Sequence, residues 1–155
     1  SLSGHESIAV MARLARFVLP GIPHHVTQRG NGRQQTFFDD SDYATYRDLL
    51  QHHCAAHGVA VWSWMLMPNH VHLILVPADA DGLRAALAEA HRRYTRMINE
   101  RMGWTGYLWQ GRFASVAMDD GHLMRCARLT SNRTRCGRAW SNERAIGAGR
   151  ARGHI

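Results

Sequence analysis

The sequence predicts an α+β domain in which a four-stranded antiparallel sheet carries helices packed on one face. The first observation is the order of elements, in which β-rich runs and segments of helical periodicity alternate as β-α-β-β-α-β before a terminal helix. The second is that the two middle strands are separated by only two residues, which favours an antiparallel hairpin. The third is length, because 155 residues suffice for one hydrophobic core but not for two.

A strand and a helix are expected in the first half of the domain. Residues 24–28 (HHVTQ) alternate and include β-branched side chains, and a glycine-containing turn sequence follows them. A helix is then expected to begin near Asp39 and to end before Gly58, which stands where a helix-terminating glycine is common. Its buried face has helical spacing and consists of Tyr43, Tyr46, Leu49, Leu50 and Cys54.

Two strands, a second helix and a fourth strand are expected in the second half. The β-rich runs 59–67 (VAVWSWMLM) and 70–76 (HVHLILV) flank a Pro68-Asn69 break. The second helix should extend from Asp81 to about Gly103, and its apolar face consists of Leu83, Leu87, Ala90, Tyr94, Met97 and Ile98. Residues 108–118 are expected to form the fourth strand, and residues 121–129 to begin the terminal helix.

Composition argues against several classes of protein. No apolar run approaches about 18 residues, so no membrane span is expected. Residues 1–10 show neither a pattern nor a signal-peptide profile, and we expect a disordered extension ahead of a domain that starts at Met11. The three cysteines (Cys54, Cys126 and Cys136) include no CxxC pair. Reduced thiols in the cytoplasm are therefore expected, in place of a disulfide framework or a zinc site.

Charge points to a polyanionic partner. Nineteen basic residues, all of them arginine, stand against twelve acidic residues and give a net charge of +7. A balance of this kind favours binding to nucleic acid, and guanidinium groups suit phosphate and base contacts. A GC-rich genome would also account for the use of arginine in place of lysine, but it would not account for the net charge.

The candidate for chemistry is the His70-Val71-His72 triplet in the third predicted strand. Because side chains alternate along a strand, both imidazoles face one way and Val71 faces the helices. Two histidines on one face of a sheet can hold a divalent cation. The alternative interpretation is a polar sheet face with two solvent-exposed histidines.

Four segments resemble the single-tyrosine HUH transposases of bacterial insertion sequences, and in particular the REP-associated tyrosine transposases. They are PHHVTQRGN, FFDDSDY, MLMPNHVHLILVP and LWQGRFAS. The similarity covers about residues 11–128, which we take as the transposase domain. It implies a ferredoxin-like fold and an enzyme that cleaves and rejoins single-stranded or hairpin DNA. Many relatives are dimers, and for this chain either a monomer or a homodimer is expected.

The resemblance also implies a metal centre. His70 and His72 match the two metal-ligating histidines of the family motif. The divalent metal, Mg²⁺ or Mn²⁺, would polarise the scissile phosphate and offset the charge that develops in the transition state. Imidazole ligands suit Mn²⁺ better than Mg²⁺, which prefers oxygen.

The nucleophile implied by the resemblance is missing. In the family, a tyrosine on the terminal helix forms a 5′-phosphotyrosine link, and an asparagine four residues later can complete the metal site. Leu129 and Arg133 stand at these two positions. Tyr94 and Tyr107 are the nearest tyrosines in sequence, and we expect structural roles for both, Tyr94 in the apolar stripe of the second helix and Tyr107 in an aromatic cluster.

We infer a frameshift near Leu129 as the cause of this loss, either a genuine one in the gene or an artefact of sequencing. With a permitted choice of codons, residues 129–140 read two bases later give Tyr-Val-Glu-Pro-Asn-Pro-Val-Arg-Ala-Gly-Leu. Ten of the eleven middle bases, which the observed residues fix, agree with the family segment Tyr-Ile-Glu-Leu-Asn-Pro-Val-Arg-Ala-Gly-Leu. Residues 129–155 are accordingly predicted to be an out-of-frame basic tail that is disordered and has nonspecific affinity for DNA.

Several other residues are candidates for DNA contact or for packing. Arg29 and Arg112 could contact phosphates or bases, and the basic stretch of the second helix could contact the DNA backbone through Arg92, Arg93 and Arg96. Solvated arginines are the alternative in each case. Trp62 and Trp64 are expected to face the core together. The pairs His24-His25 and His52-His53 are expected to be structural or on the surface.

Three functions stay open on the sequence alone. The first is a DNA transposase whose cleavage is impaired because the tyrosine is missing, so its standing as an enzyme is uncertain. The second is a non-catalytic protein that binds DNA hairpins, and the third is a transposase relic whose product is unstable. A nucleotide hydrolase of the histidine-triad type is disfavoured because Ile74 stands where the third histidine would be.

Overall fold

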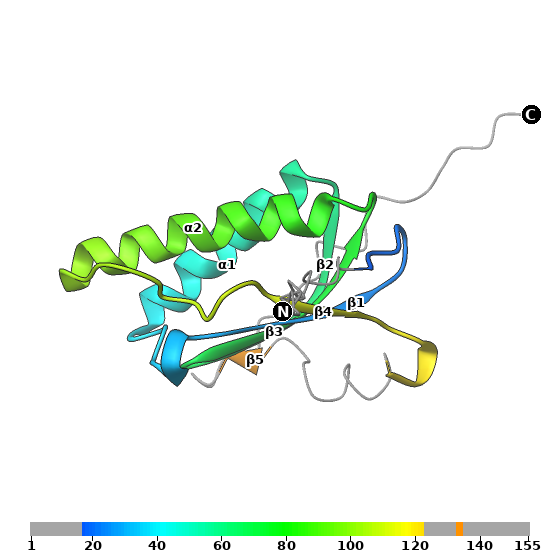
Figure 1. The fold of residues 1–155 in the computed structure, drawn as a ribbon. Coiled ribbons are helices and arrows are strands. Elements are labelled where there is room, and N and C mark those ends of the chain that lie inside the picture. Colours follow the sequence, from blue (N-terminus) through cyan, green and yellow to red (C-terminus); the bar gives the residue numbers. More distant parts are fainter. Residues whose placement is uncertain (1–16, 123–132, 135–155) are drawn as a thin grey trace, which may run out of the picture.

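The computed structural model describes residues 17–122 and 133–134, and Figure 1 shows their arrangement. In chain order the elements are β1 (His24–Arg29), η1 (Asn31–Arg33), α1 (Asp40–Ala56), β2 (Val59–Met67), β3 (His70–Pro77), α2 (Gly82–Met102), β4 (Ala114–Ala117) and β5 (Arg133–Thr134). The predicted β-α-β-β-α-β order is confirmed. None of the helices in these described ranges is long and apolar enough to cross a membrane.

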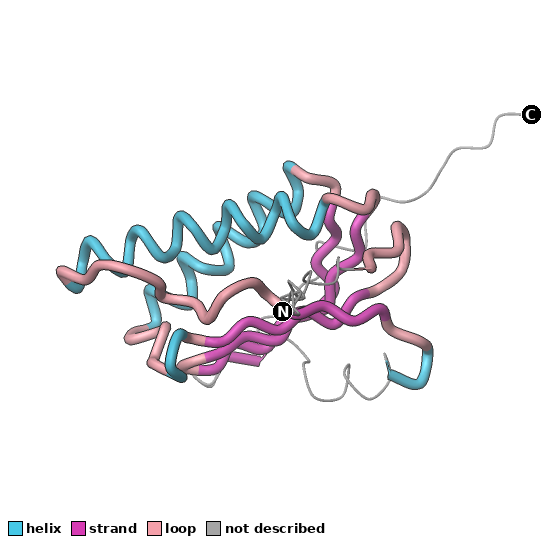
Figure 2. Tube along the Cα trace, in the orientation of Figure 1, coloured by secondary structure: helices cyan, strands magenta, loops and turns pink. Residues whose placement is uncertain are grey.

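The strands form one sheet in the order β4-β1-β3-β2-β5 (Figure 2). The pairings β4-β1, β1-β3 and β3-β2 are antiparallel, as predicted, and α1 and α2 lie together on one face (Figure 1). β5 is an addition that sequence reasoning did not anticipate. It lies in the tail predicted to be disordered and pairs in parallel with Met65 and Leu66 of β2. The remainder of that tail, and the extension over residues 1–10, lie outside the described residues.

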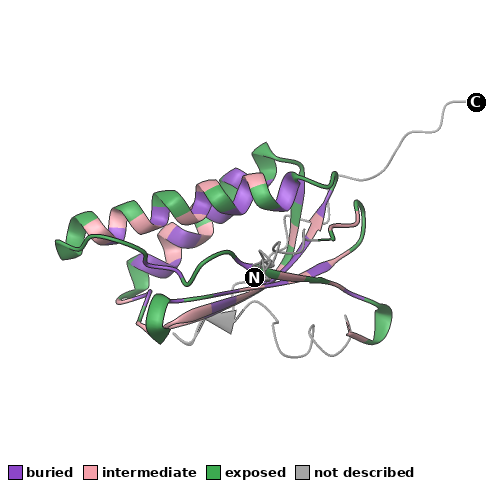
Figure 3. Ribbon diagram, in the orientation of Figure 1, coloured by how far each residue is buried: buried purple, intermediate pink, exposed green. Residues whose placement is uncertain are grey.

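The hydrophobic core lies between the helices and the sheet (Figure 3). The predicted apolar faces of both helices enter it, and its largest fully buried side chains include Tyr46, Leu50, Leu83, Leu87 and Tyr94. Val71, Leu73 and Leu75 of β3 are all fully buried on the helix side. Since side chains alternate along a strand, the burial of Val71 directs its two neighbours, His70 and His72, to the opposite face.

The fourth strand is shorter than the sequence predicted. Only residues 114–117 pair with β1, whereas residues 108–113 form a loop that is bonded to the end of β1. The Gln110 N–H donates to the Arg29 carbonyl at 2.8 Å, and the Asn31 N–H donates to the Leu108 carbonyl at 2.9 Å. Gly111 has a φ of +59°, which a regular strand cannot accommodate, so the continuous ladder of β4 starts after it and only an isolated bridge between Gly30 and Trp109 precedes it.

The expectation that Trp62 and Trp64 share a core-facing side is wrong. Trp64 is buried, but 53% of Trp62 is exposed. The register of β2 against β3 shifts between Val61 and Ser63, and this irregularity is the physical reason. A bulge inserts one residue, so the residues that follow it change faces relative to those before it.

Candidate metal and DNA site

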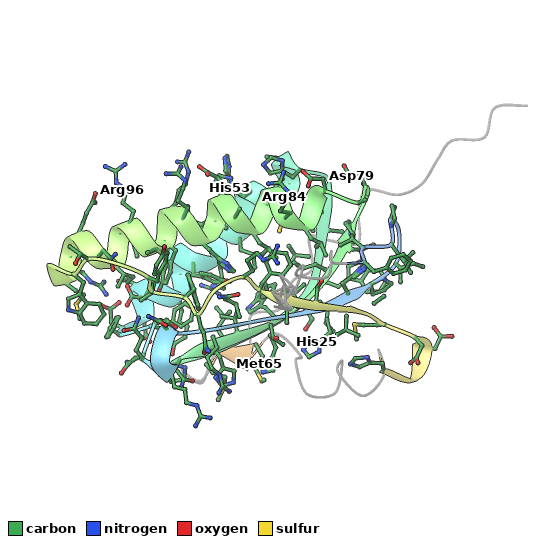
Figure 4. All side chains as sticks on the ribbon, viewed as in Figure 1. His25, His53, Met65, Asp79, Arg84 and Arg96 are labelled. Atoms are coloured by element: carbon green, nitrogen blue, oxygen red, sulfur yellow. The ribbon has the colours of Figure 1, made fainter. Side chains whose placement is uncertain are left out.

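The site begins with the hairpin of β2 and β3. His70 and His72 are both partly buried on the sheet face opposite α1 and α2, with ring centroids 5.2 Å apart in an edge-to-face arrangement. Figure 4 shows their side of the sheet through the labelled His25 and Met65, which lie away from the helices. The register of the hairpin places Met65 of β2 beside His72 of β3. The predicted common orientation of the two histidines is therefore present.

His25 of β1 is a part of this site that sequence reasoning missed. Its Nε2 lies 3.0 Å from Nδ1 of His72, and the two rings are nearly parallel with centroids 5.3 Å apart. The other histidine of the pair, His24, is fully buried and contacts the backbone at Leu19 and Ile22, as expected for a structural residue. The alternation of residues 24–28 already predicts that His24 and His25 face opposite sides of the sheet. Only the pairing of β1 with β3 brings His25 to His72.

The turn between β2 and β3 supplies the second contact. The Oδ1 atom of Asn69 lies 2.7 Å from Nδ1 of His70, and its Nδ2 donates to the Arg33 carbonyl at 3.2 Å. The Gly30 N–H donates to the Asn69 carbonyl at 2.8 Å, and the Thr36 N–H donates to the Pro68 carbonyl at 2.7 Å. These bonds fix the turn against the segment that follows β1.

Both candidate ligands are neutral at neutral pH. Burial, the neighbouring histidines His25 and His70, and Arg29 lower the pKa of His72 to about 4. Burial and Arg29 also lower the pKa of His70. A metal ion binds the neutral imidazole, so the environment keeps both lone pairs available. In the described part of the chain, no group of three or more His, Cys, Asp or Glu side chains is arranged to hold a metal, so these two histidines supply only part of a coordination shell.

Two arginines border the histidines. A hollow of about 330 Å³ is lined by Thr27, Gln28, Arg29, His70, Val71, His72, Gln110, Arg112 and Ala114. Arg29 and Arg112 are the charged members of this lining, and neither forms an ion pair with any residue in the described ranges. Two guanidinium groups that no carboxylate of residues 17–122 or 133–134 pairs, beside two neutral imidazoles, make the hollow electropositive, which suits a phosphate.

The three arginines of α2 that were candidates for DNA contact, Arg92, Arg93 and Arg96, lie elsewhere. Figure 4 shows Arg96 on the helix side of the molecule, across the sheet from His25. Arg96 is paired with Glu100 at 2.7 Å, and Arg92 and Arg93 are paired with Glu89 at 2.6 Å and 2.8 Å. The hydrogen bonds from Arg92 and Arg93 lower the pKa of Glu89 to about 2. The structure therefore does not bring this basic stretch to the hollow, and its contact with DNA stays a prediction.

A second hollow lies on the helix side of the sheet. Its volume is about 360 Å³, and it lies between α2 and the loop before β4, with Arg92, His91, Trp109 and Phe113 among its lining residues. Arg112 lines this hollow as well as the one beside the histidines. Arg112 is thus placed at the border between an apolar hollow and an electropositive one.

No tyrosine lines the hollow that holds the histidines. The chain has four tyrosines, and all of them lie in the described ranges. Tyr43, Tyr46 and Tyr94 are buried in the core, where the Tyr94 hydroxyl donates to the Thr36 carbonyl at 2.8 Å. Tyr107 is 84% exposed in the loop after α2 and lines the second hollow, not the one beside the histidines. Leu129, at the position of the expected nucleophile, lies outside the described residues.

Comparison with known proteins identifies the family of the chain and relatives with the same fold. The family model of IS200-like transposases matches residues 20–127. A REP-associated tyrosine transposase bound to a REP hairpin superposes with a TM-score of 0.60 at 19% identity, over 75% of this chain and 67% of that chain. A predicted transposase from Deinococcus radiodurans superposes with a TM-score of 0.54 at 18% identity, over 76% of this chain and 95% of that chain. No curated protein matches the sequence.

Proposed function

Because the chain belongs to the IS200-like transposase family, we propose that it binds single-stranded or hairpin DNA at the hollow beside His70 and His72. The reaction expected for such a protein is cleavage and rejoining of DNA through a metal ion and a tyrosine. We further propose that this chain retains the groups that bind the phosphate and the metal but is impaired in cleavage. Its location in the cytoplasm, expected from the cysteines, is part of the same proposal.

The observation that carries the proposal is the convergence of His70, His72, Arg29 and Arg112 on one hollow. The four side chains come from β1, β3 and the loop before β4, so the sheet topology and not sequence proximity assembles them. A guanidinium group can form two parallel hydrogen bonds to one phosphate. Arg29 and Arg112 are free to do so because no carboxylate in the described ranges competes for them.

The histidines fit a divalent cation. Both are neutral at neutral pH, both line the hollow, and their rings are 5.2 Å apart. Mn²⁺ suits two imidazole ligands better than Mg²⁺ does. A bound cation of this kind would supply Lewis acidity at the scissile phosphate. The protein's own residues would do the rest. Arg29 and Arg112 would hold the phosphate, and His70 and His72 would keep two nitrogen lone pairs available for the cation.

The missing step is the nucleophilic attack. None of the four tyrosines lines the hollow, and Leu129 stands where the resemblance places the attacking hydroxyl. Without that hydroxyl, no phosphotyrosine link can form and the energy of the broken phosphodiester cannot be conserved for rejoining. We therefore expect DNA binding without a covalent adduct.

The test compares this chain with a frame-restored control. Labelled single-stranded and hairpin oligonucleotides are incubated with each protein and Mn²⁺, binding is followed by fluorescence anisotropy, and adducts are sought on a denaturing gel. In the control, residues 129–139 are replaced by Tyr-Val-Glu-Pro-Asn-Pro-Val-Arg-Ala-Gly-Leu. We expect both proteins to bind DNA and only the control to form an adduct. Failure of this chain to bind would contradict its DNA-binding role, and an adduct on it would contradict the loss of cleavage.

A second candidate function, hairpin binding with no catalytic role, is favoured by the same missing tyrosine. It differs from an impaired transposase in what the histidines do. If the chain is a hairpin binder only, replacing His70 and His72 by alanine should leave its DNA affinity unchanged with or without Mn²⁺. If the metal centre is retained, Mn²⁺ should strengthen DNA binding by the natural chain and not by the double variant.

A further inference from the structure

Each of the two histidines in the hollow already has one ring nitrogen engaged by a neighbour. Nδ1 of His70 lies 2.7 Å from Oδ1 of Asn69, and Nδ1 of His72 lies 3.0 Å from Nε2 of His25. It is the same nitrogen in both rings. The atom left over in each ring is Nε2, and this regularity determines which nitrogen a cation could reach.

The proton of His70 can be assigned from the turn. The Nδ2 group of Asn69 donates to the Arg33 carbonyl, so the amide is oriented with its oxygen towards His70. An amide oxygen only accepts hydrogen bonds. Nδ1 of His70 must therefore carry the proton, and Nε2 of the neutral ring carries the lone pair.

The pair His25 and His72 has two possible proton arrangements. Either the Nε2–H of His25 donates to Nδ1 of His72, or the Nδ1–H of His72 donates to Nε2 of His25. Only the second arrangement leaves a lone pair on Nε2 of His72. A cation that binds His72 through Nε2 therefore selects it, and His25 then acts as the hydrogen-bond acceptor behind the ligand.

We propose that Asn69 and His25 are positioning residues that hold His70 and His72 through Nδ1, in the tautomers that present both Nε2 atoms to one divalent cation. The part of this inference that concerns the cation rests on the proposed function. Metal-ligating histidines commonly donate their second ring N–H to such a partner, and removing the partner typically lowers metal affinity by about 10- to 100-fold.

Both positioning residues are themselves held in place. The Asn69 backbone carbonyl accepts the Gly30 N–H at 2.8 Å, and its side chain is bonded to the carbonyl of Arg33 in η1. His25 lies on β1, between its sheet partners Ile74 on β3 and Val116 on β4. The two residues that contact the rings are thus themselves fixed, which restricts ring rotation before any cation arrives.

Two substitutions of Asn69 separate its contacts. Asn69→Leu and Asn69→Asp both remove the Nδ2 donor to the Arg33 carbonyl, but Asn69→Asp keeps an oxygen that accepts from Nδ1 of His70. Loss of turn stability alone would affect both variants equally. His25→Leu removes the acceptor behind His72, and His52→Leu, at an exposed histidine of α1, serves as its control.

The first measurement uses the metal-free full-length protein, in which long-range ¹H–¹⁵N NMR spectra report the tautomer of each histidine. We expect His70 to carry its proton on Nδ1 in the natural chain and in Asn69→Asp, and to shift towards the Nε2–H form in Asn69→Leu. A proton on Nε2 of His70 in the natural chain would overturn the assignment. So would identical spectra for Asn69→Leu and Asn69→Asp.

The second measurement is Mn²⁺ affinity, followed by electron paramagnetic resonance of free Mn²⁺. We expect about a 10- to 100-fold loss for Asn69→Leu and for His25→Leu, and no loss for Asn69→Asp or His52→Leu. Unchanged affinity in Asn69→Leu and His25→Leu would overturn the positioning role. No Mn²⁺ binding by the natural chain would instead overturn the metal centre of the proposed function, and the tautomers read without metal would separate the two failures.

Discussion

Arg101, near the end of α2, holds the buried carboxylate of Asp42, in the first turn of α1, through hydrogen bonds of 2.7 Å and 2.8 Å. Asp42 is fully buried, and its carboxylate also accepts the N–H of Phe38 at 2.8 Å. Asp39 and Asp42 form a capping box at the start of α1. One carboxylate thus caps a helix and joins the two helices that cover the sheet.

This relationship predicts a large loss of stability when Arg101 is replaced. In Arg101→Leu the carboxylate of Asp42 remains buried without its counter-ion, and an unpaired buried charge costs several kcal/mol. Because 37% of the Arg101 side chain is exposed and backbone N–H groups still bond Asp42, we expect about 2–3 kcal/mol. Urea unfolding at pH 7 measures this loss as the difference in the free energy of unfolding between Arg101→Leu and the natural chain.

The matched control is Arg96→Leu on the same helix. Arg96 forms an ion pair with Glu100 in which the side chains are 73% and 64% exposed. Pairs of this kind contribute about 0.3–0.5 kcal/mol. Equal losses in Arg101→Leu and Arg96→Leu would show that the buried pair is not a structural tie between α1 and α2.

The stability of the domain should fall as the pH decreases from 6.5 towards 5. His91 bonds the Tyr46 hydroxyl at 2.9 Å and packs on Trp109, and burial lowers its pKa to about 4. The unfolded chain takes up this proton near pH 6.5, whereas the folded chain does so only near pH 4. The stabilisation is therefore complete above pH 6.5, and His91 alone should account for a loss of up to about 2 kcal/mol by pH 5.

His91→Phe tests the assignment, since it keeps a ring at this position and removes the titration. Urea unfolding at pH 7.5, 6.5, 5.8 and 5.0 should give a shallower pH dependence in this variant, whatever its stability at pH 7.5. Residual slope is expected because burial also lowers the pKa of His25, His53, His70 and His72. An unchanged slope would show that His91 titrates normally in the folded protein.

Most of the fold could be predicted because the local spacing of apolar residues indicates both long helices, most of the strands and their buried faces. The apolar stripes of both helices and the alternation around Val71 each indicate which face is buried, and the structure agrees. The exceptions arise where one residue interrupts a pattern. The bulge beside Trp62 and the positive φ of Gly111 each end a regular alternation, and nothing in the spacing of apolar residues marks them.

The candidate site could be predicted only in part. His70 and His72 are two residues apart, so strand periodicity alone places them together. His25 lies 47 residues before His72, and its contact depends on the register between β1 and β3, which the sequence does not specify. The sequence places Asn69 in a turn, but the direction of its amide depends on the carbonyl of Arg33, 36 residues away.

Replacement of the arginines in the hollow should weaken DNA binding more than replacement of those on α2. Arg29 and Arg112 line the electropositive hollow without carboxylate partners in the described ranges, so each can engage a phosphate. We expect Arg29→Gln and Arg112→Gln each to lower affinity for single-stranded DNA by roughly tenfold, which corresponds to about 1.4 kcal/mol. Fluorescence anisotropy in 0.1 M salt measures the change.

The comparison set is Arg93→Gln and Arg96→Gln, which remove the same charge from the opposite side of the molecule. Both arginines are occupied by carboxylates, so we expect less than a twofold change in affinity. The salt dependence of binding adds a second readout. Removing one arginine that neutralises a phosphate should reduce the slope of log K against log salt concentration by about 0.7 for a single strand. If all four variants lose affinity and slope alike, net charge controls binding, and the hollow beside His70 and His72 is not the DNA site.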